Sequence, residues 1–392
     1  MKIAFVTPRY GAEVAGGAET GARRVAELLA TRPGWAIETL TTCALDERTW
    51  ADHYPPGETE VSGVRVRRFP IESGRHPQFD ERSRALFADP EAITAATEAQ
   101  WLSDQGPVAP ALLDAVATSD ADVLVFTPYL FDPTVRGLPS VASRAVLVPA
   151  AHDEAPIRLA MYRRVFADAS GLVFHTEAEQ RFVQEHFPVG HHPQTVIGLG
   201  CDPAPGEPGE ARTRVGLGDR PYVLCLGRVD DGKGTGYLAR FFAAYKERCP
   251  GPLALVLAGP VHDTPAPHPD IVVTGRVDEH TKWGLLRGAI ALVVPSAHES
   301  FSIVLLEAWS AGIPVIVNGR CVPTREQCAR SGGGLWYGRF ATFAATLDRL
   351  VESPALRASL AAKGRDYVIA RYQWGHVVDR YAAFLELISG QR

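Results

Sequence analysis

The stretch ALVVPSAHESFSIVLLEAWSAGIPVIV, residues 291–317, decides the fold that we expect for this chain. It opens with a short apolar run that predicts a buried strand. A polar loop follows, then apolar residues at helical spacing from Ile303 to Ala311, and then a second apolar run. A strand, a helix and a strand in succession are typical of a parallel sheet. We therefore expect an α/β fold whose ligands bind at the carboxyl ends of the strands.

Two carboxylates flank the start of the predicted helix. Glu299 lies in the loop, and Glu307 follows inside the helix. Ser300 or Ser302 could cap the helix. The outward-facing backbone N–H groups of the first turn would then lie near Phe301, Ser302 and Ile303. Free amides at a helix N-terminus favour a phosphate, so the pattern indicates a nucleotide-sugar site. Ordinary loop and helix charges remain the alternative.

A second stretch, YVLCLGRVDDGKGTGYL at residues 222–238, predicts a strand that ends in a glycine turn with two cations. Arg228 offers a planar fork and Lys233 a point charge, which suits the two phosphates of a donor. Solvated loop cations are the plainer interpretation of the same residues.

The same stretch nearly matches a P-loop, because Gly227, Gly232 and Lys233 satisfy GxxxxGK. A P-loop needs a Ser or Thr hydroxyl directly after the lysine to hold Mg²⁺. Gly234 occupies that position here and Thr235 is displaced by one, so we keep a P-loop nucleotide-binding protein only as an alternative.

GRVDDGKG followed by the pair of glutamates eight positions apart resembles glycosyltransferase family 4, whose members are retaining enzymes of the GT-B fold. The resemblance spans nearly the whole chain. Its other parts are the opening MKIAFVTPRYGAEVAGGAE, VIGLGCD at 196–202 and QWGHVVDRYAAFLEL at 373–387. It implies two Rossmann-like, doubly wound domains that face each other across a cleft. One departure is Ser300-Phe301-Ser302, where the family often has glycines, and it puts the identity of the donor hexose in doubt.

The resemblance also implies roles for particular residues. Glu299 would hold hydroxyls of the donor hexose and stabilise an oxocarbenium-like state, while Glu307 would bind the ribose. His152 would contact the donor sugar, and with Glu299 it forms the expected catalytic pair. Attack would occur on the face from which the diphosphate leaves, with no protein base. Arg228 and Lys233 would offset the leaving charge without a metal.

In the N-terminal half, Gly16 and Gly17 precede a predicted helix over 18–30, where their amides can approach the donor phosphates. Pairs of glycines are also common in ordinary turns. Their spacing does not fit the GxGxxG of a nicotinamide enzyme. His152 follows the predicted strand 144–150 at its carboxyl end, where catalytic groups gather. His175, at the end of another strand, is a weaker candidate.

Strand and helix patterns alternate along the chain and predict two domains. We expect an acceptor-side domain over 1–200, a Pro- and Gly-rich linker over 201–220 and a donor-binding domain over 221–372, with a helix over 373–392 that returns to the first domain. The predicted strands are 2–7, 36–42, 64–70, 122–128, 144–150, 171–176, 195–199, 222–228, 253–258, 271–276, 291–296 and 314–318.

Composition and short sequence patterns indicate which partners and which location to expect. A formal net charge of −5 gives no general attraction to nucleic acid. The six cysteines contain no CxxC pair, so we expect reduced thiols. The start of the chain lacks a basic-then-apolar signal and no apolar run approaches ~18 residues, so we expect a cytoplasmic protein. Arg158, Arg163 and Arg164 interleave with apolar residues, which leaves peripheral contact with the inner membrane face open beside an ordinary half-buried helix.

Metal chemistry is not expected. The Asp120-Ala121-Asp122 tripeptide lies at the start of a strand, the wrong edge for ligands, and His191 and His192 are adjacent rather than spaced for a metal. The predicted activity is transfer of a hexose to a glycan, lipid-linked or small-molecule acceptor, as in polysaccharide biosynthesis, with no cofactor besides the nucleotide sugar. A sugar-nucleotide epimerase or hydrolase on the same fold, or a catalytically silent nucleotide-binding module, remains an alternative.

Overall fold

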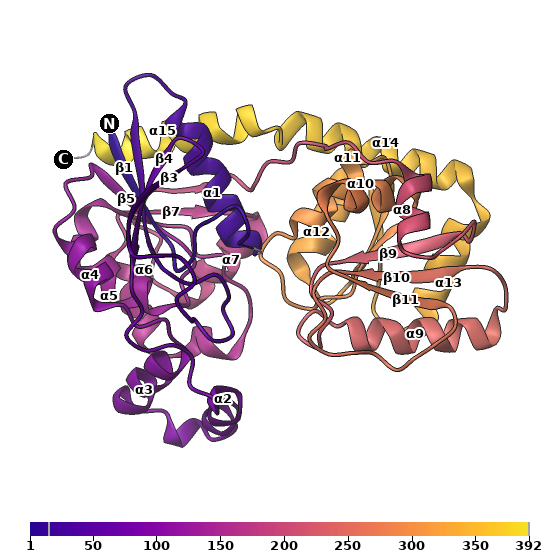
Figure 1. Cartoon of the computed structure of the whole chain (residues 1–392), viewed down its shortest axis with the longest axis horizontal. Coiled ribbons are helices and arrows are strands. Elements are labelled where there is room, and N and C mark those ends of the chain that lie inside the picture. Colours follow the sequence, from indigo (N-terminus) through magenta and orange to yellow (C-terminus); the bar gives the residue numbers. More distant parts are fainter. Residues whose placement is uncertain (15, 391–392) are drawn as a thin grey trace. The chain divides into compact units, whose positions relative to one another are not determined.

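The computed structural model describes residues 1–14 and 16–390, and the chain divides into two compact units (Figure 1). Unit 1 contains residues 1–198 together with the stretch from Val377 onward, and unit 2 contains residues 199–376. The first domain was predicted to end at residue 200, and the first stretch of unit 1 ends two residues earlier, at Gly198.

Unit 1 is built on an eight-stranded sheet in the order β3-β4-β2-β1-β5-β6-β7-β8. Neighbouring strands are parallel except for β3 with β4. The strands are β1 (Lys2–Val6), β2 (Ala36–Thr42), β3 (Gly57–Val61), β4 (Val64–Phe69), β5 (Val123–Phe126), β6 (Ala145–Leu147), β7 (Gly171–Phe174) and β8 (Gln194–Val196). The central strands are almost continuously apolar because helices cover both faces of a parallel sheet.

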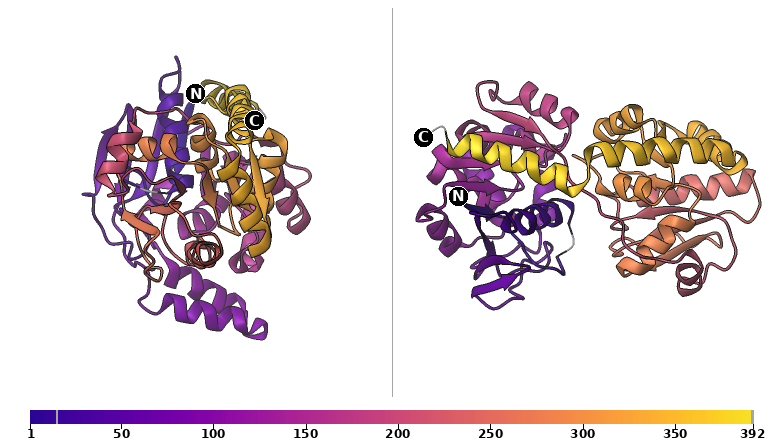
Figure 2. Two further views of the ribbon diagram at one scale, coloured as in Figure 1. Left: turned by 90° about the vertical axis from the view of Figure 1, so that its right-hand side faces the viewer. Right: turned by 90° about the horizontal axis from the view of Figure 1, so that it is seen from above.

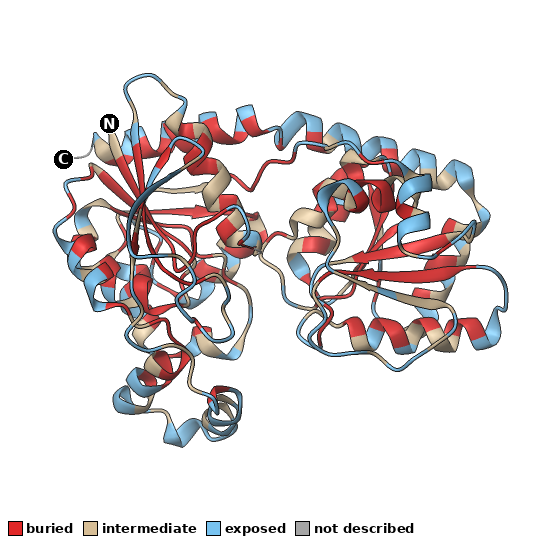
Figure 3. Ribbon diagram, viewed as in Figure 1, coloured by how far each residue is buried: buried red, intermediate tan, exposed pale blue. Residues whose placement is uncertain are grey.

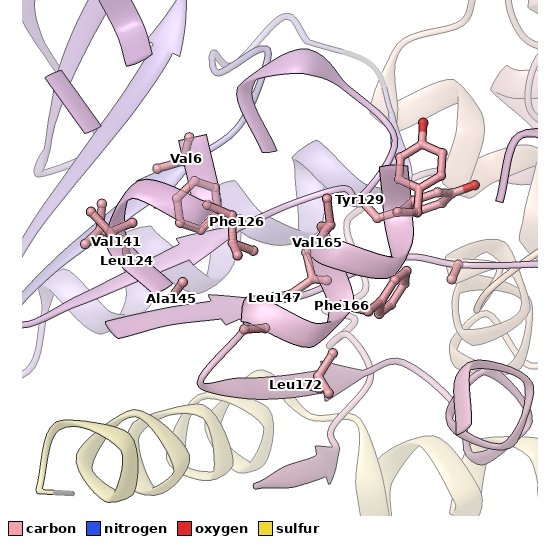
Figure 4. Close-up of a cluster of buried hydrophobic side chains, with 14 of the residues drawn as sticks. Val6, Leu124, Phe126, Tyr129, Val141, Ala145, Leu147, Val165, Phe166 and Leu172 are labelled. Atoms are coloured by element: carbon pink, nitrogen blue, oxygen red, sulfur yellow. The ribbon is translucent and has the colours of Figure 1, made fainter. Parts of the chain in front are cut away.

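The helices of unit 1 lie mostly between successive strands. They are α1 (Gly17–Ala30), α2 (Phe79–Ala88), α3 (Ala95–Gln105), α4 (Pro110–Ala117), α5 (Asp132–Gly137), α6 (Met161–Asp168) and α7 (Glu177–His186), with short 3₁₀ turns at Pro90–Ala92, Leu138–Arg144 and Ala155–Arg158. Figure 4 shows the core that they cover, in which Phe126, Leu147 and Leu172 from three neighbouring strands meet Val165 and Phe166 of α6.

Unit 2 is built on a six-stranded parallel sheet in the order β11-β10-β9-β12-β13-β14. Its strands are β9 (Tyr222–Leu226), β10 (Ala254–Ala258), β11 (Ile271–Gly275), β12 (Leu292–Val294), β13 (Val315–Asn318) and β14 (Gly334–Tyr337). Figure 3 shows strands of both sheets in the colour of buried residues. The connection from β11 to β12 passes over β10 and β9, so β12 lies beside β9. Because these two strands are parallel, their carboxyl ends deliver their loops to the same edge of the sheet.

The helices of unit 2 flank this sheet. They are α8 (Pro208–Arg214), α9 (Thr235–Arg248), α10 (Glu279–Gly288), α11 (Ile303–Ser310), α12 (Val322–Ser331), α13 (Phe340–Glu352) and α14 (Pro354–Arg371). One face of α13 packs Phe343, Leu347 and Leu350 into the core with Leu238 and Phe242 of α9.

Two segments differ in detail from the sequence expectation. The predicted linker over 201–220 contains α8 and belongs to unit 2. Its Arg212 donates a hydrogen bond to the carbonyl of Gly288, 3.2 Å away, so this segment packs on α10. The last helix, α15 (Trp374–Ser389), can be followed in yellow in Figure 2. From Val377 onward it lies in unit 1, where Arg380 bonds the carbonyl of Ile197 at 2.9 Å.

The predicted strands are present, but β3 and β14 were missed. β3 has the polar sequence GETEV and is mostly exposed at the edge of its sheet, so it lacks the apolar alternation that marks a strand. β14 is only four residues long and is also an edge strand. Among the described residues, no helix is long and apolar enough to span a bilayer.

Candidate donor-binding site

The loop after β9 is folded around the carboxylate of Asp230. The backbone N–H of Lys233 donates to Asp230 Oδ1 at 2.7 Å, and Arg228 Nε lies 3.1 Å from Asp230 Oδ2. Gly234 then takes a left-handed conformation with φ 74° and begins α9. Asp230 therefore orders the loop that carries Lys233 and pairs with the guanidinium of Arg228 at the carboxyl end of the strand, a role that the sequence did not suggest.

Lys233 and Glu299 meet across two loops. Lys233 Nζ lies 2.7 Å from Glu299 Oε1, and the side chains are 34% and 13% exposed. One residue follows β9 and the other follows β12, which are parallel neighbours, so their carboxyl ends bring the residues together. Glu299, the predicted hexose-binding carboxylate, and Lys233, the predicted phosphate-binding cation, thus lie side by side in unit 2.

The start of α11 differs from the expected cap. Ser302 precedes the helix in a left-handed conformation with φ 68°, and its side chain makes no cap hydrogen bond. Phe301 is buried, with its ring 5.4 Å from the ring of Tyr372, and its carbonyl accepts a bond from Gln327. The helix begins at Ile303, as the apolar spacing predicted. Packing of Phe301, rather than a serine cap, fixes the turn.

Glu307 lies inside α11 and is engaged by a lysine of α10. Lys282 Nζ is 2.9 Å from Glu307 Oε1. Burial raises the pKa of the Glu307 carboxyl, while the charge of Lys282 acts in the opposite direction. Lys282 could not be assigned this role from the sequence, because its partner lies 25 residues away on another helix.

The predicted glycine pair of unit 1 opens α1. Gly16 precedes the helix with an extended backbone, and Gly17 is its first residue. A Cβ atom on Gly16 would lie 2.4 Å from a carboxylate oxygen of Glu19, whereas a Cβ on Gly17 would meet no atom within 4 Å. Glu19 in turn pairs with the buried guanidinium of Arg9, whose Nε is 3.0 Å from Glu19 Oε1. A larger residue at Gly16 would therefore have to displace the carboxylate of Glu19 that pairs with Arg9.

His152 lies in the loop after β6 and is half-buried. Its Nε2 is 3.6 Å from Glu154 Oε2, and Tyr129 donates to the other oxygen of Glu154 at 2.7 Å. The preceding backbone is held by Glu179, whose Oε1 accepts the N–H of Ala151 at 2.7 Å. This loop thus presents His152 at the carboxyl edge of the sheet, as expected.

His175 is placed differently from His152, because its side chain is buried beside Glu179. Burial lowers the pKa of His175 to about 4. Burial also raises the pKa of Glu179 to about 8, although Glu179 accepts backbone N–H bonds that favour its charged form. His175 is therefore better explained as part of the interior than as a ligand-binding residue.

Thr235, the hydroxyl nearest to the position that a P-loop requires, is buried and donates to the carbonyl of Asp230 at 3.0 Å. It is therefore not available to hold Mg²⁺ as a P-loop hydroxyl does. Arg158 pairs with Asp153, and Arg164 Nε lies 3.1 Å from Asp168, so two of the three arginines near α6 are paired. In the described part of the chain, no cluster of three His, Cys, Asp or Glu side chains is arranged to hold a metal ion.

Known proteins resemble parts of this chain. Residues 220–353, most of unit 2, match the family described as glycosyl transferases group 1. A D-inositol 3-phosphate glycosyltransferase of Salinispora arenicola is 29% identical over 265 residues, which cover 60% of this chain and 58% of that protein. The chain thus spans little more than half the length of that curated relative.

Solved structures resemble the chain over its whole length. A sucrose-phosphate synthase from Thermosynechococcus elongatus is 18% identical and covers 100% of both chains with a TM-score of 0.75. The Anabaena protein HepE, crystallised with UDP and glucose, is 16% identical and covers 98% of this chain and 99% of its own, with a TM-score of 0.68. The fold is therefore GT-B, and the predicted fold class is confirmed.

Proposed function

We propose that this chain, which carries the glycosyl transferases group 1 domain in residues 220–353, moves a hexose-type sugar from a nucleoside-diphosphate sugar to an acceptor hydroxyl. One observation carries most weight: Lys233 Nζ lies 2.7 Å from Glu299 Oε1, at the edge of the sheet where β9 and β12 end. A cation and a carboxylate held together there suit a ligand that joins phosphates to a hydroxyl-rich sugar.

Each donor group has a partner in unit 2. Arg228 and Lys233 bind the diphosphate together with the amides of Ser302 and Ile303 at the start of α11. Glu299 accepts hydroxyls of the hexose, and Phe301 supports this turn from the interior. Glu307 accepts hydroxyls of the ribose. When the diphosphate binds, Lys233 interacts with both Glu299 and a phosphate. This holds the carboxylate of Glu299, which binds the hexose, next to the leaving group.

The reaction proceeds without a metal in this proposal. As the bond between the anomeric carbon and the diphosphate breaks, negative charge grows on the phosphate oxygens. Fixed cations and helix amides stabilise that charge without reorganising, which is the largest contribution in many such sites. Asp230 orders the loop that carries both cations, through the Lys233 N–H at 2.7 Å and the Arg228 Nε at 3.1 Å, while Glu299 holds Lys233 Nζ at 2.7 Å.

The configuration at the anomeric carbon is retained. The acceptor hydroxyl attacks on the face from which the diphosphate departs, and its proton passes to a leaving phosphate oxygen, so no protein base is required. Glu299 stabilises the positive charge that develops on the sugar ring. In unit 1, we assign His152 to the donor sugar and the amides of Gly16 and Gly17 to the donor phosphates.

The acceptor is a glycan, a lipid-linked sugar or a small hydroxylated molecule, and unit 1 binds it. The name of the Salinispora relative makes inositol 3-phosphate the first small molecule to try. We propose a cytoplasmic location, with peripheral contact at the inner face of the membrane as the alternative.

Binding is tested first, by thermal shift with UDP, GDP, ADP, dTDP and ATP, each with EDTA and with Mg²⁺. A ligand that binds only the folded state raises the melting temperature. We expect one nucleoside diphosphate to stabilise the protein equally in EDTA and in Mg²⁺. Stabilisation by ATP with Mg²⁺ alone would overturn the proposal in favour of a P-loop protein.

Turnover is tested next, with the sugar nucleotide of the base that binds. Transfer to an acceptor supports the proposal, whereas isomerised or hydrolysed donor without transfer favours an epimerase or hydrolase. Binding with no donor consumption favours a silent module. Lys233→Met should abolish nucleotide stabilisation, and Lys363→Met, on the exposed surface of α14, is the matched control in the same unit.

A further inference from the structure

The side chain of Glu307 is only 13% exposed and has a lysine beside it. Lys282 Nζ lies 2.9 Å from Glu307 Oε1 and 2.8 Å from Glu279 Oε2, so the lysine joins this largely covered carboxylate of α11 to an exposed carboxylate of its own helix. The Lys282 side chain is itself only 20% exposed. A lysine that gives up this much hydration needs a partner, and Glu307 supplies it.

Local structure sets the direction of this lysine. Asp278 caps α10 by accepting the N–H of Thr281 at 2.7 Å, which fixes where the helix begins. Thr281 and Trp283, on either side of Lys282, are buried. Lys282 therefore leaves the helix close to its packed face and reaches toward α11.

The environment of Glu307 would otherwise favour the neutral acid. Burial is the largest influence on its pKa and raises it, and the charge of Glu279 acts in the same direction. Lys282 opposes both. Cys201 also interacts with this carboxylate: burial, and after it the charge of Glu307, raises the pKa of the Cys201 thiol to about 12. Lys282 is thus the cation that opposes protonation of Glu307.

We propose that Lys282 is a positioning residue for the donor ribose, acting through Glu307, an inference that rests on the proposed function. Lys282 keeps Glu307 ionised and holds Oε1 in place, so that the carboxylate accepts hydrogen bonds from ribose hydroxyls. A protonated Glu307 would instead present a donor and lose one acceptor. Nucleotide affinity then depends on a lysine that touches no part of the nucleotide.

The first test compares dissociation constants for UDP between the wild-type protein and Lys282→Met from pH 6.5 to 9, by calorimetry. The ratio of the two constants cancels the titration of the diphosphate itself. Because protonation of Glu307 opposes ribose binding, we expect the ratio to be largest at low pH. It should shrink by about tenfold per pH unit below the raised pKa and level off above it. A ratio independent of pH overturns the inference.

The second test is a double-mutant cycle with Glu307→Gln. If Lys282 acts only through Glu307, Lys282→Met should weaken UDP binding no further in the glutamine background. Preference for UDP over 2′-deoxy-UDP should fall in either single variant, since both alter the ribose contact. Independent, additive losses overturn the inference.

Lys246→Met is the matched control. Lys246 is also a buried lysine of unit 2, and its Nζ bonds the carbonyl of Leu253 at 3.1 Å and lies 3.4 Å from Asp270. Its loss should lower stability but leave the pH profile of UDP binding unchanged. GDP replaces UDP if GDP is the nucleotide that binds. If no nucleoside diphosphate binds the wild-type protein, the proposed function fails. Binding that is insensitive to Lys282 overturns this inference alone.

Discussion

Replacing Glu179 by glutamine should remove a pH dependence of stability between about pH 6.5 and 8. Glu179 is fully buried at the start of α7, where Oε1 accepts the N–H of Ala151 and Oε2 accepts the N–H of His175, each at 2.7 Å. Burial raises the pKa of its carboxyl from 4.5 to about 8. In the unfolded chain the same carboxyl loses its proton near pH 4.5.

The folded and unfolded states bind different numbers of protons, and this difference sets the direction in which the free energy of unfolding changes with pH. Between pH 4.5 and 8 folded Glu179 keeps a proton that the unfolded chain has lost, so the free energy of unfolding falls as pH rises. His175 has the opposite effect between about pH 4 and 6.5, because burial lowers its pKa from 6.5 to about 4. The two slopes cancel between about pH 4.5 and 6.5. From pH 6.5 to 8, Glu179 is the one of these two groups that contributes, at about 1.4 kcal/mol per unit, or about 2 kcal/mol in all.

The assay is urea unfolding of wild-type protein and Glu179→Gln at half-unit steps from pH 5.5 to 8.5. Between pH 6.5 and 8 the unfolding free energy of the wild-type protein should fall by about 2 kcal/mol relative to that of Glu179→Gln, because only the wild-type protein carries this titration. Glu185→Gln, on the exposed side of the same helix, should run parallel to wild type. A constant difference between wild type and Glu179→Gln over this range would refute the reasoning.

Three further changes give separate tests. Gly259→Ala should destabilise unit 2 by more than about 2 kcal/mol, because φ is 151° and a Cβ would lie 1.9 Å from the carbonyl oxygen of Gly227; Gly209→Ala, with no neighbour within 4 Å, should not, as urea unfolding would show. Leu347→Ala, fully buried in the α13 face, should cost about 2–5 kcal/mol by the same assay, and an unchanged midpoint would contradict that packing. Lys233→Met should lower kcat about 10²- to 10³-fold in a donor-consumption assay, and unchanged kinetics would remove the phosphate assignment.

Much of the site could be predicted because its residues lie in short segments. Apolar runs located β9 and β12, and residues that follow parallel strands at the carboxyl end reach the same edge. Arg228, Lys233 and Glu299 could therefore be placed near one another from order and spacing alone. In the folded protein, Lys233 and Glu299 do lie next to each other and form an ion pair.

Other residues could not be predicted because their partners are distant in sequence. Lys282 looks like a solvated helix lysine until α10 packs beside α11. Glu179 looks like an exposed acid in the first turn of α7 until β6 and β7 bring Ala151 and His175 against it. The expected serine cap at Ser302 failed because burial of Phe301 determined the turn.

The sequence by itself determined the α/β class, most of the strands and the local phosphate-binding segments, because hydrophobic periodicity and glycine turns act over a few residues. Only the tertiary structure decided which carboxylates are buried, which lysine opposes their protonation and how α8 and α15 are assigned to the units. Burial and ion pairing depend on elements that meet after folding, and no short-range pattern records them.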